Sequence, residues 1–223
     1  MPRRVTPLVN GEFYHIFNRG ISRQPVFLNR KDYRRLFELT KFYRLVDYPI
    51  RYSKFLLLPK EERKKFFKTM RKADKVVKVI CFCFMPNHFH FLLCQEREGG
   101  ISGFIRNLEI SYTRFFNIKH ERIGPLFQGQ FKAVRIEGEE QLIHVSRYIH
   151  LNPLTSYVVK RPEQLEDYQW SSFLDYIGES QGNICNTKPV LDLFPTKRDY
   201  KEFVYNQVDY QKGLESMKHL VFD

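Results

Sequence analysis

An apolar run from Val76 to Leu93 constrains the fold of this chain more than any other segment. The run is dense in β-branched and aromatic residues, and only Met85-Pro86-Asn87 interrupts it. Residues of these types favour β-strands, and Pro followed by Asn favours a tight turn. The segment therefore predicts two adjacent strands joined by a short connection.

The flanking segments complete an α+β pattern. Residues 12–18 are aromatic and predict a first strand, and residues 31–43 have the apolar spacing of an amphipathic helix with a basic outer face. After the strand pair, the spacing predicts a helix over 101–118, a short strand over 131–136, and a helix from about 139 that ends near Asn152 because Pro153 follows. This β-α-β-β-α-β order, followed by a helix, is typical of a ferredoxin-like or RRM-like antiparallel sheet with one open face.

Residues 51–78 interrupt the pattern with a concentration of basic side chains. The basic positions are Lys60, Arg63, Lys64, Lys65, Lys68, Arg71, Lys72, Lys75 and Lys78. We expect an exposed basic helix or helical hairpin inserted between the core elements. A solvated face and a contact with a nucleic-acid backbone are both open interpretations of such a segment.

The length of 223 residues allows one well-buried domain with an extension. We expect this domain to span residues 1–177. The apolar pattern weakens after Trp170, and residues 178–223 are expected to form a charged, partly helical carboxy-terminal extension whose role the pattern does not indicate.

Charge and cysteine content bear on partners and location. The net charge of +12 and the 16% aromatic content favour a nucleic acid as partner, although a merely basic surface would look the same. There is no apolar stretch of membrane-spanning length and no signal-peptide pattern, so we expect a cytoplasmic protein. Cys81 and Cys83 lack the spacing of a zinc site and are expected to be small buried hydrophobic residues.

Two histidines lie on the predicted strand that follows Pro86-Asn87. Alternation along a strand places His88, His90 and Leu92 on one face, with the phenylalanines between them on the other. Two imidazoles at this spacing are able to bind one ion, and a further ligand has to come from another element. The pattern predicts a metal site, with a structural role for the histidines as the alternative.

The last predicted helix supplies a candidate for that ligand. Tyr148 and Asn152 are four residues apart, so they lie on the same helix face, with His144 one turn earlier. An amide oxygen from Asn152 would favour a hard cation such as Mg or Mn. The structural alternative makes Tyr148 an interface residue and Asn152 a helix cap.

These segments resemble the HUH single-tyrosine transposases, and among them the REP-associated branch. Met85-Pro-Asn-His-Phe-His-Phe-Leu-Leu is similar to the HUH strand, and Tyr148-Ile-His-Leu-Asn-Pro to the helix that carries the catalytic tyrosine. Further similarity lies in Tyr14-His-Ile-Phe-Asn-Arg-Gly, Gly124-Pro-Leu-Phe-Gln-Gly-Gln-Phe and Tyr168-Gln-Trp-Ser-Ser, so the resemblance runs from about residue 11 to 177. The chain departs from the family at Gln130, often a basic residue, and at Ser22, often asparagine.

The resemblance implies a DNA transposase that cuts and rejoins single-stranded DNA near hairpins. Tyr148 would be the nucleophile and would form a 5′-phosphotyrosine link, while His88, His90 and Asn152 would hold the divalent metal, Mg or Mn. The expected partner is single-stranded DNA with a hairpin, and a homodimer is left open. No nucleotide cofactor is expected, which agrees with the lack of a G-x-x-x-x-G-K-[ST] loop.

Residues that contact DNA are harder to assign from the sequence. The basic candidates are Arg19, Arg30, Arg34, Arg35, Lys64, Lys68 and Lys132. The candidates for base stacking are Tyr14, Phe17, Tyr112 and Phe127, for each of which core packing is the favoured alternative. The rival functional class is a catalytically silent hairpin-binding or RNA-binding module on the same fold.

Overall fold

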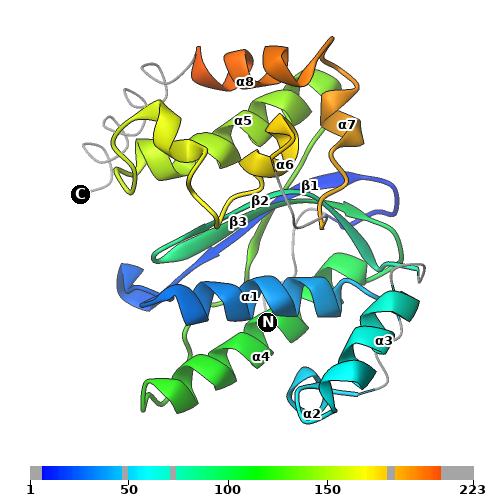
Figure 1. Ribbon diagram of the computed structural model, residues 1–223, viewed down its shortest axis with the longest axis vertical. Helices are drawn as coiled ribbons and strands as arrows, with labels where there is room; N and C mark the ends of the chain where they lie inside the picture. The colour runs from blue at the N-terminus through cyan, green and yellow to red at the C-terminus, as the bar shows by residue number, and fades with distance from the viewer. Residues whose placement is uncertain (1–6, 47–49, 71–73, 180–183, 207–223) are drawn as a thin grey trace.

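A four-stranded antiparallel sheet lies at the centre of the chain, in the strand order β2-β3-β1-β4 (Figure 1). Its strands are β1 (Phe13–Arg19), β2 (Val77–Met85), β3 (His88–Gln95) and β4 (Lys132–Arg135). The computed structural model describes residues 7–46, 50–70, 74–179 and 184–206. Residues 1–6, Arg71 and Lys72 of the predicted insertion, and residues 207–223 of the predicted extension lie outside the described residues.

The predicted strand pair is present. β2 and β3 pair from Val77 opposite Gln95 to Met85 opposite His88, and Pro86-Asn87 forms the turn between them. The carbonyl of Pro86 accepts hydrogen bonds from the backbone N–H groups of Val26 (2.8 Å) and Phe27 (3.1 Å), which anchor the loop after β1 beside the turn.

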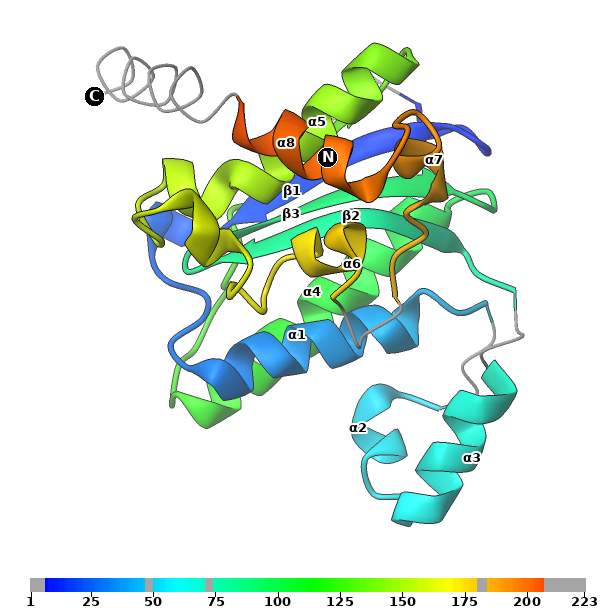
Figure 2. The same ribbon diagram turned by 45° about the horizontal axis from the view of Figure 1, so that its top comes forward.

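Two long helices cover one face of the sheet, α1 (Arg30–Tyr43) and α4 (Gly100–Lys119) (Figures 1 and 2). α1 begins where the Asn29 side chain accepts from the Lys31 N–H at 3.1 Å. The core between these helices and the sheet is rich in aromatic rings, including Phe89 and Phe91 from β3. Alternate residues of β3 thus belong to this core, as the sequence pattern predicts.

The opposite face is also covered, so the prediction of an open face is wrong. Its helices are α5 (Glu139–Thr155), η2 (Pro162–Leu165), α6 (Phe173–Ile177), α7 (Lys188–Leu191) and α8 (Lys197–Tyr205). α5 packs directly on β2 and β3, while α6, α7 and α8 surround α5 (Figure 2). Apolar side chains such as Ile149 and Leu151 pack with Leu92 and Cys94 in a second core. This core is the reason that α5 covers this face of the sheet.

Helix α5 continues past Pro153, so the prediction that it ends near Asn152 is also wrong. Proline lacks the N–H that an interior helix position donates. The last turn is closed by hydrogen bonds that do not involve a proline N–H. The Ser156 N–H donates to the Asn152 carbonyl at 3.0 Å, and the Val158 N–H donates to the Pro153 carbonyl at 2.9 Å. The helix therefore ends at Thr155.

The predicted basic insertion forms two short helices, α2 (Tyr52–Phe55) and α3 (Lys60–Met70), which project beside α1 and α4 (Figure 2). Phe55 and Phe66 pack against Phe42 of α1, with ring centroids 5.3 and 5.7 Å away, so the insertion is attached to the main core. Its predicted boundary at 78 is too late, because β2 begins at Val77 and Lys78 already pairs with Cys94 of β3.

Cys81, Cys83 and Cys94 are buried and unpaired, as expected for small apolar residues. Among the described helices, none combines the length and apolar character needed to cross a membrane.

Candidate functional site

Strand β3 presents two histidines to the α5 side of the sheet. His88 is half-buried and His90 is buried, and their ring centroids lie 4.9 Å apart with perpendicular planes. The next residue on that face, Leu92, packs in the core beneath α5. The predicted alternation along the strand is therefore confirmed.

The Asn152 amide meets both histidines. Its Oδ1 lies 3.1 Å from His88 Nε2, and its Nδ2 lies 3.4 Å from His90 Nε2. The sequence spacing alone did not establish this contact, since residues 88 and 152 belong to different elements. The fold brings the three predicted ligand residues to one place.

Two imidazole nitrogens and one amide oxygen are donor atoms of the kind that hold a divalent cation. The other nitrogen of His88, Nδ1, lies 2.6 Å from the Asn87 Oδ1, so both ring nitrogens face amide oxygens. A neutral imidazole has one proton and is able to donate to only one of them. A divalent cation would instead be held by His88 Nε2 and Asn152 Oδ1 together, which removes the need for a proton between them.

Tyr148 lies one helical turn before Asn152, beside the histidines. Its half-buried ring meets the His90 ring edge-on, with a centroid separation of 5.6 Å and an interplanar angle of 86°. Helix α5 packs on β2 and β3, which places Tyr148 on the sheet face that carries the histidines. The helix face predicted from the spacing of Tyr148 and Asn152 therefore points to the histidine pair.

Comparisons with known proteins bear on this cluster. Residues 43–152, which contain both histidines, Tyr148 and Asn152, match the family described as IS200-like transposase. The chain is a member of that family. Membership implies a DNA-cleaving enzyme, and HUH transposases typically use a divalent metal. Among curated proteins, none matches the chain.

The fold of this chain is also similar to that of a solved protein. That protein is a REP-associated tyrosine transposase whose structure was determined bound to a REP hairpin. The two chains share 16% sequence identity with a TM-score of 0.54, over 83% of this chain and 94% of the other. At this identity the likeness concerns the fold.

His15 also belongs to this cluster, although the sequence pattern did not indicate it. Its Nε2 lies 2.9 Å from His90 Nδ1, and its ring also approaches Tyr148, with centroids 5.8 Å apart. Burial lowers the pKa of His15 to about 4, so the ring is neutral near pH 7 and its Nε2 is able to accept a hydrogen bond from the His90 Nδ1–H. A proton on His90 Nδ1 leaves Nε2 free as a ligand.

The sequence contains one signal for His15, which is its place on the same strand face as Phe17 and Arg19. That signal becomes specific only with the pairing of β1 and β3, where Phe17 lies opposite His90 and Arg19 opposite His88. The pairing register is a property of the folded sheet.

A buried polar network fixes the position of α5 in the transposase. The two ring nitrogens of His150 lie 2.7 Å from the Tyr200 hydroxyl of α8 and 2.8 Å from the Ser172 hydroxyl. Ser172 Oγ also accepts from the Phe82 N–H of β2 at 2.8 Å. Burial lowers the pKa of His150 to about 3, so the network holds a neutral ring.

His144, in contrast, is exposed. Its Nδ1 lies 2.6 Å from Arg147, and it takes no part in the site.

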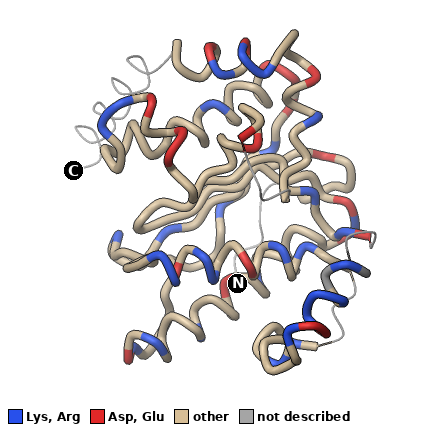
Figure 3. Tube along the Cα trace, viewed as in Figure 1, with Lys and Arg blue, Asp and Glu red and all other residues tan. Residues whose placement is uncertain are grey.

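The predicted DNA-contacting basic residues of the transposase fall into two groups. Arg19 and Lys132 are exposed and lie close to the site. In the strand register, Arg19 lies opposite His88 and Lys132 lies opposite Phe17. The others lie away from the site on α1 and α3, where lysine and arginine are frequent (Figure 3): Arg30, Arg34, Arg35, Lys64 and Lys68.

The aromatic candidates for base stacking divide in the same way. Tyr14 and Tyr112 are fully buried and Phe127 is 6% exposed, so core packing is the correct interpretation for these three. Phe17 is half-buried and lies 5.7 Å from the His90 ring. It alone of the four is placed near the candidate site.

Proposed function

We propose that this transposase cleaves and rejoins single-stranded DNA near hairpins, with Tyr148 as nucleophile and a divalent metal held by His88, His90 and Asn152. The observation that carries the proposal is the convergence of both histidine Nε2 atoms on the Asn152 amide, directly beside the Tyr148 ring. Two elements distant in sequence, β3 and α5, meet there, which a purely structural role does not require.

In the proposed cleavage, the Tyr148 oxygen attacks the scissile phosphorus and loses its proton to solvent. The bond between phosphorus and the 3′ oxygen breaks, which leaves a free 3′-hydroxyl and a 5′-phosphotyrosine. A second 3′-hydroxyl then attacks the phosphotyrosine, so the tyrosine oxygen departs and takes up a proton. The number of phosphodiester bonds is conserved, and no nucleotide cofactor is required.

The protein's own residues orient this reaction. Asn87 and His15 hold the Nδ1 atoms of the two histidines, so that both Nε2 atoms point to the phosphate site. When bound there, Mg or Mn would polarise the scissile phosphate and offset its developing charge. Arg19 and Lys132 are placed to contact the DNA backbone beside the site.

The likeness to a transposase solved with a REP hairpin supports a hairpin with a single-stranded flank as the substrate. The +12 charge supports a polyanionic partner in general.

The decisive experiment uses end-labelled single-stranded oligonucleotides from the regions flanking the gene, each with a predicted hairpin, in Mg or Mn and separated on a denaturing gel. We expect a protein-sized labelled band that EDTA removes and that Tyr148→Phe lacks, although this variant still binds the DNA. Tyr157→Phe is the matched control, because Tyr157 is 70% exposed and lies just beyond α5. DNA that is bound but never cut or captured would favour a catalytically silent hairpin-binding protein.

A further inference from the structure

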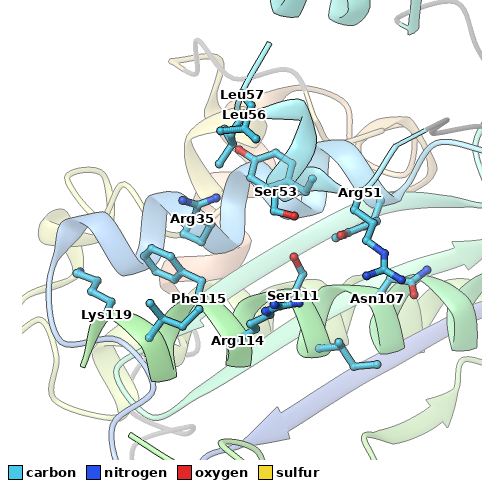
Figure 4. Close-up of a pocket in the computed structure, with 14 residues that line it drawn as sticks. Arg35, Arg51, Ser53, Leu56, Leu57, Asn107, Ser111, Arg114, Phe115 and Lys119 are labelled. Carbon is cyan, nitrogen blue, oxygen red and sulfur yellow. The ribbon is translucent and has the colours of Figure 1, made fainter. Parts of the chain in front are cut away.

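A groove of about 760 Å³ lies on the side of α4 that faces away from the sheet, between α4, α1 and α2 (Figure 4). Its α4 wall includes Ile110, Arg114 and Ile118, which recur at intervals of four residues, and Phe115 beside them. The α4 residues that face the sheet, such as Leu108 and Tyr112, form a different stripe. The groove is therefore separated from the histidine site by the helix layer and the sheet.

The groove exposes branched aliphatic side chains. Ile110 is 63% exposed and Ile118 is 73% exposed on α4, and Leu57 is 84% exposed on the opposite wall. Single exposed apolar residues are common, but three on the walls of one groove form a patch of the kind that binds another protein. No described part of the chain covers them.

The same groove carries positive charge. Among the described residues, Arg35, Arg51 and Arg114 form no ion pair with a carboxylate, whereas Lys119 pairs with the buried Asp32. Figure 4 shows Arg35 and Arg51 on one wall and Arg114 on the other. A ligand that lies between the walls would meet both arginines and aliphatic groups on each side.

The aromatic rings of the groove are already engaged. The Arg35 guanidinium lies over the Phe115 ring at 4.4 Å and over the Tyr52 ring at 5.3 Å from the centroid. Single-stranded nucleic acids gain much of their affinity from bases stacked on free aromatic faces. Here Arg35 covers ring faces, and the accessible apolar groups are aliphatic, which favours a protein ligand over a nucleic acid.

We propose that this groove binds an amphipathic α-helix of a partner protein, with its apolar face on Ile110, Ile118 and Leu57 and with acidic residues opposite Arg51 and Arg114. The α4 wall from residue 107 to 118 extends over about 16 Å, the length of three helical turns. Apolar residues of the bound helix would recur at i, i+3, i+4 and i+7, as in other helix-in-groove complexes.

The test uses a fluorescein-labelled, side-chain-stapled peptide of about four turns, with leucine at those positions and glutamate along both flanks. Fluorescence anisotropy with the full-length protein measures its affinity. Two control peptides keep the length: one replaces glutamate with glutamine, and one has the same composition in scrambled order. We expect the acidic amphipathic peptide to bind at least about tenfold more tightly than either control.

Variants locate the binding. Arg114→Ser and Ile118→Ser should each weaken the peptide about tenfold. The matched controls are Arg106→Ser and Ile123→Ser, which alter exposed residues outside the groove and should change the affinity less than twofold. All four sites are exposed, and circular dichroism checks that each variant is folded.

Several results would overturn the proposal. Equal binding of the scrambled peptide, equal weakening by Arg106→Ser, or no binding at all would remove the specific groove. A single-stranded oligonucleotide that competes for the groove and depends on Arg114 but not on Ile118 would make it a nucleic-acid site. A dimer that Ile118→Ser dissociates in size-exclusion chromatography with light scattering would assign the surface to a second copy of the chain.

Discussion

The two faces of strand β3 differ in kind, although they are made by adjacent residues. Phe89 and Phe91 are completely buried in the aromatic core under α1 and α4, while His88 and His90 make polar contacts under α5. The first face gains free energy from removing apolar area from water. The second places donor atoms with defined directions. One strand therefore separates stability from chemistry by the alternation of its side chains.

The largest effect is expected on the aromatic face. Phe91→Ala should lower the free energy of unfolding by about 3–5 kcal/mol, because it leaves a cavity among Phe82, Phe84 and Phe104. Denaturant titration measures this loss. The folded fraction should still cleave DNA, so a folded variant without any activity would break the separation between the faces.

The next effect belongs to the polar face. His88→Ala should lower metal-dependent cleavage by more than about a hundredfold, since second-shell changes alone cost tenfold to a hundredfold. DNA affinity should change far less, because this histidine is assigned to the metal and not to the DNA. Gel cleavage assays and filter binding with the same oligonucleotide compare the two. Full activity of this variant in EDTA would end the metal assignment.

A smaller effect tests the positioning role of His15. His15→Ala should weaken Mn binding, measured by calorimetry on the free protein, by about tenfold to a hundredfold, because His90 loses the partner that holds its Nδ1 proton. His15→Gln retains an acceptor and should recover part of the affinity. If both variants bind Mn like the parent chain, His15 has only a packing role.

The smallest effect concerns a half-buried acid on the α1 and α4 side. Burial raises the pKa of Glu109 to about 7, although Asn18 donates to its carboxylate at 2.8 Å. An unfolded glutamate ionises near pH 4.5, so ionisation of the unfolded chain lowers stability progressively from about pH 4.5 to 7. Glu109→Gln, which keeps an acceptor for Asn18, should stabilise the protein by about 1 kcal/mol at pH 8 and hardly at pH 4. Thermal unfolding across this range checks the sign, and a pH-independent difference would contradict it.

Much of the architecture was predictable because the sequence alternates clearly in the informative segments. The strand pair, both long helices and the histidine face follow from apolar spacing and from the turn residues Pro86 and Asn87. The contact of Asn152 with the histidines was not fixed by spacing, and the family resemblance supplied that expectation. The structure adds how the contact is made.

Other features were not predictable, for physical reasons. β2 has a register shift between Val79 and Cys81, so that Ile80 and Cys81 pack in the same core. A strand that is apolar on both faces has no polar residue to fix its register. The place of His15 in the site was not predictable for a related reason, since its contact with His90 depends on which strand lies beside β1. The cover over the α5 face depends on contacts between residues far apart in the chain, such as His150 with Tyr200.

The bond between His150 and Tyr200 also has a consequence for how the protein matures. The strands and α5 precede α8 in the chain, so they are synthesised before it. Until Tyr200 is synthesised, the His150 ring lacks one of its two hydroxyl partners. Helix α5, which carries Tyr148, then lacks this hydrogen bond to α8. The proposed reactive side chains on β1, β3 and α5 are therefore synthesised before the contact that helps to hold α5 in place.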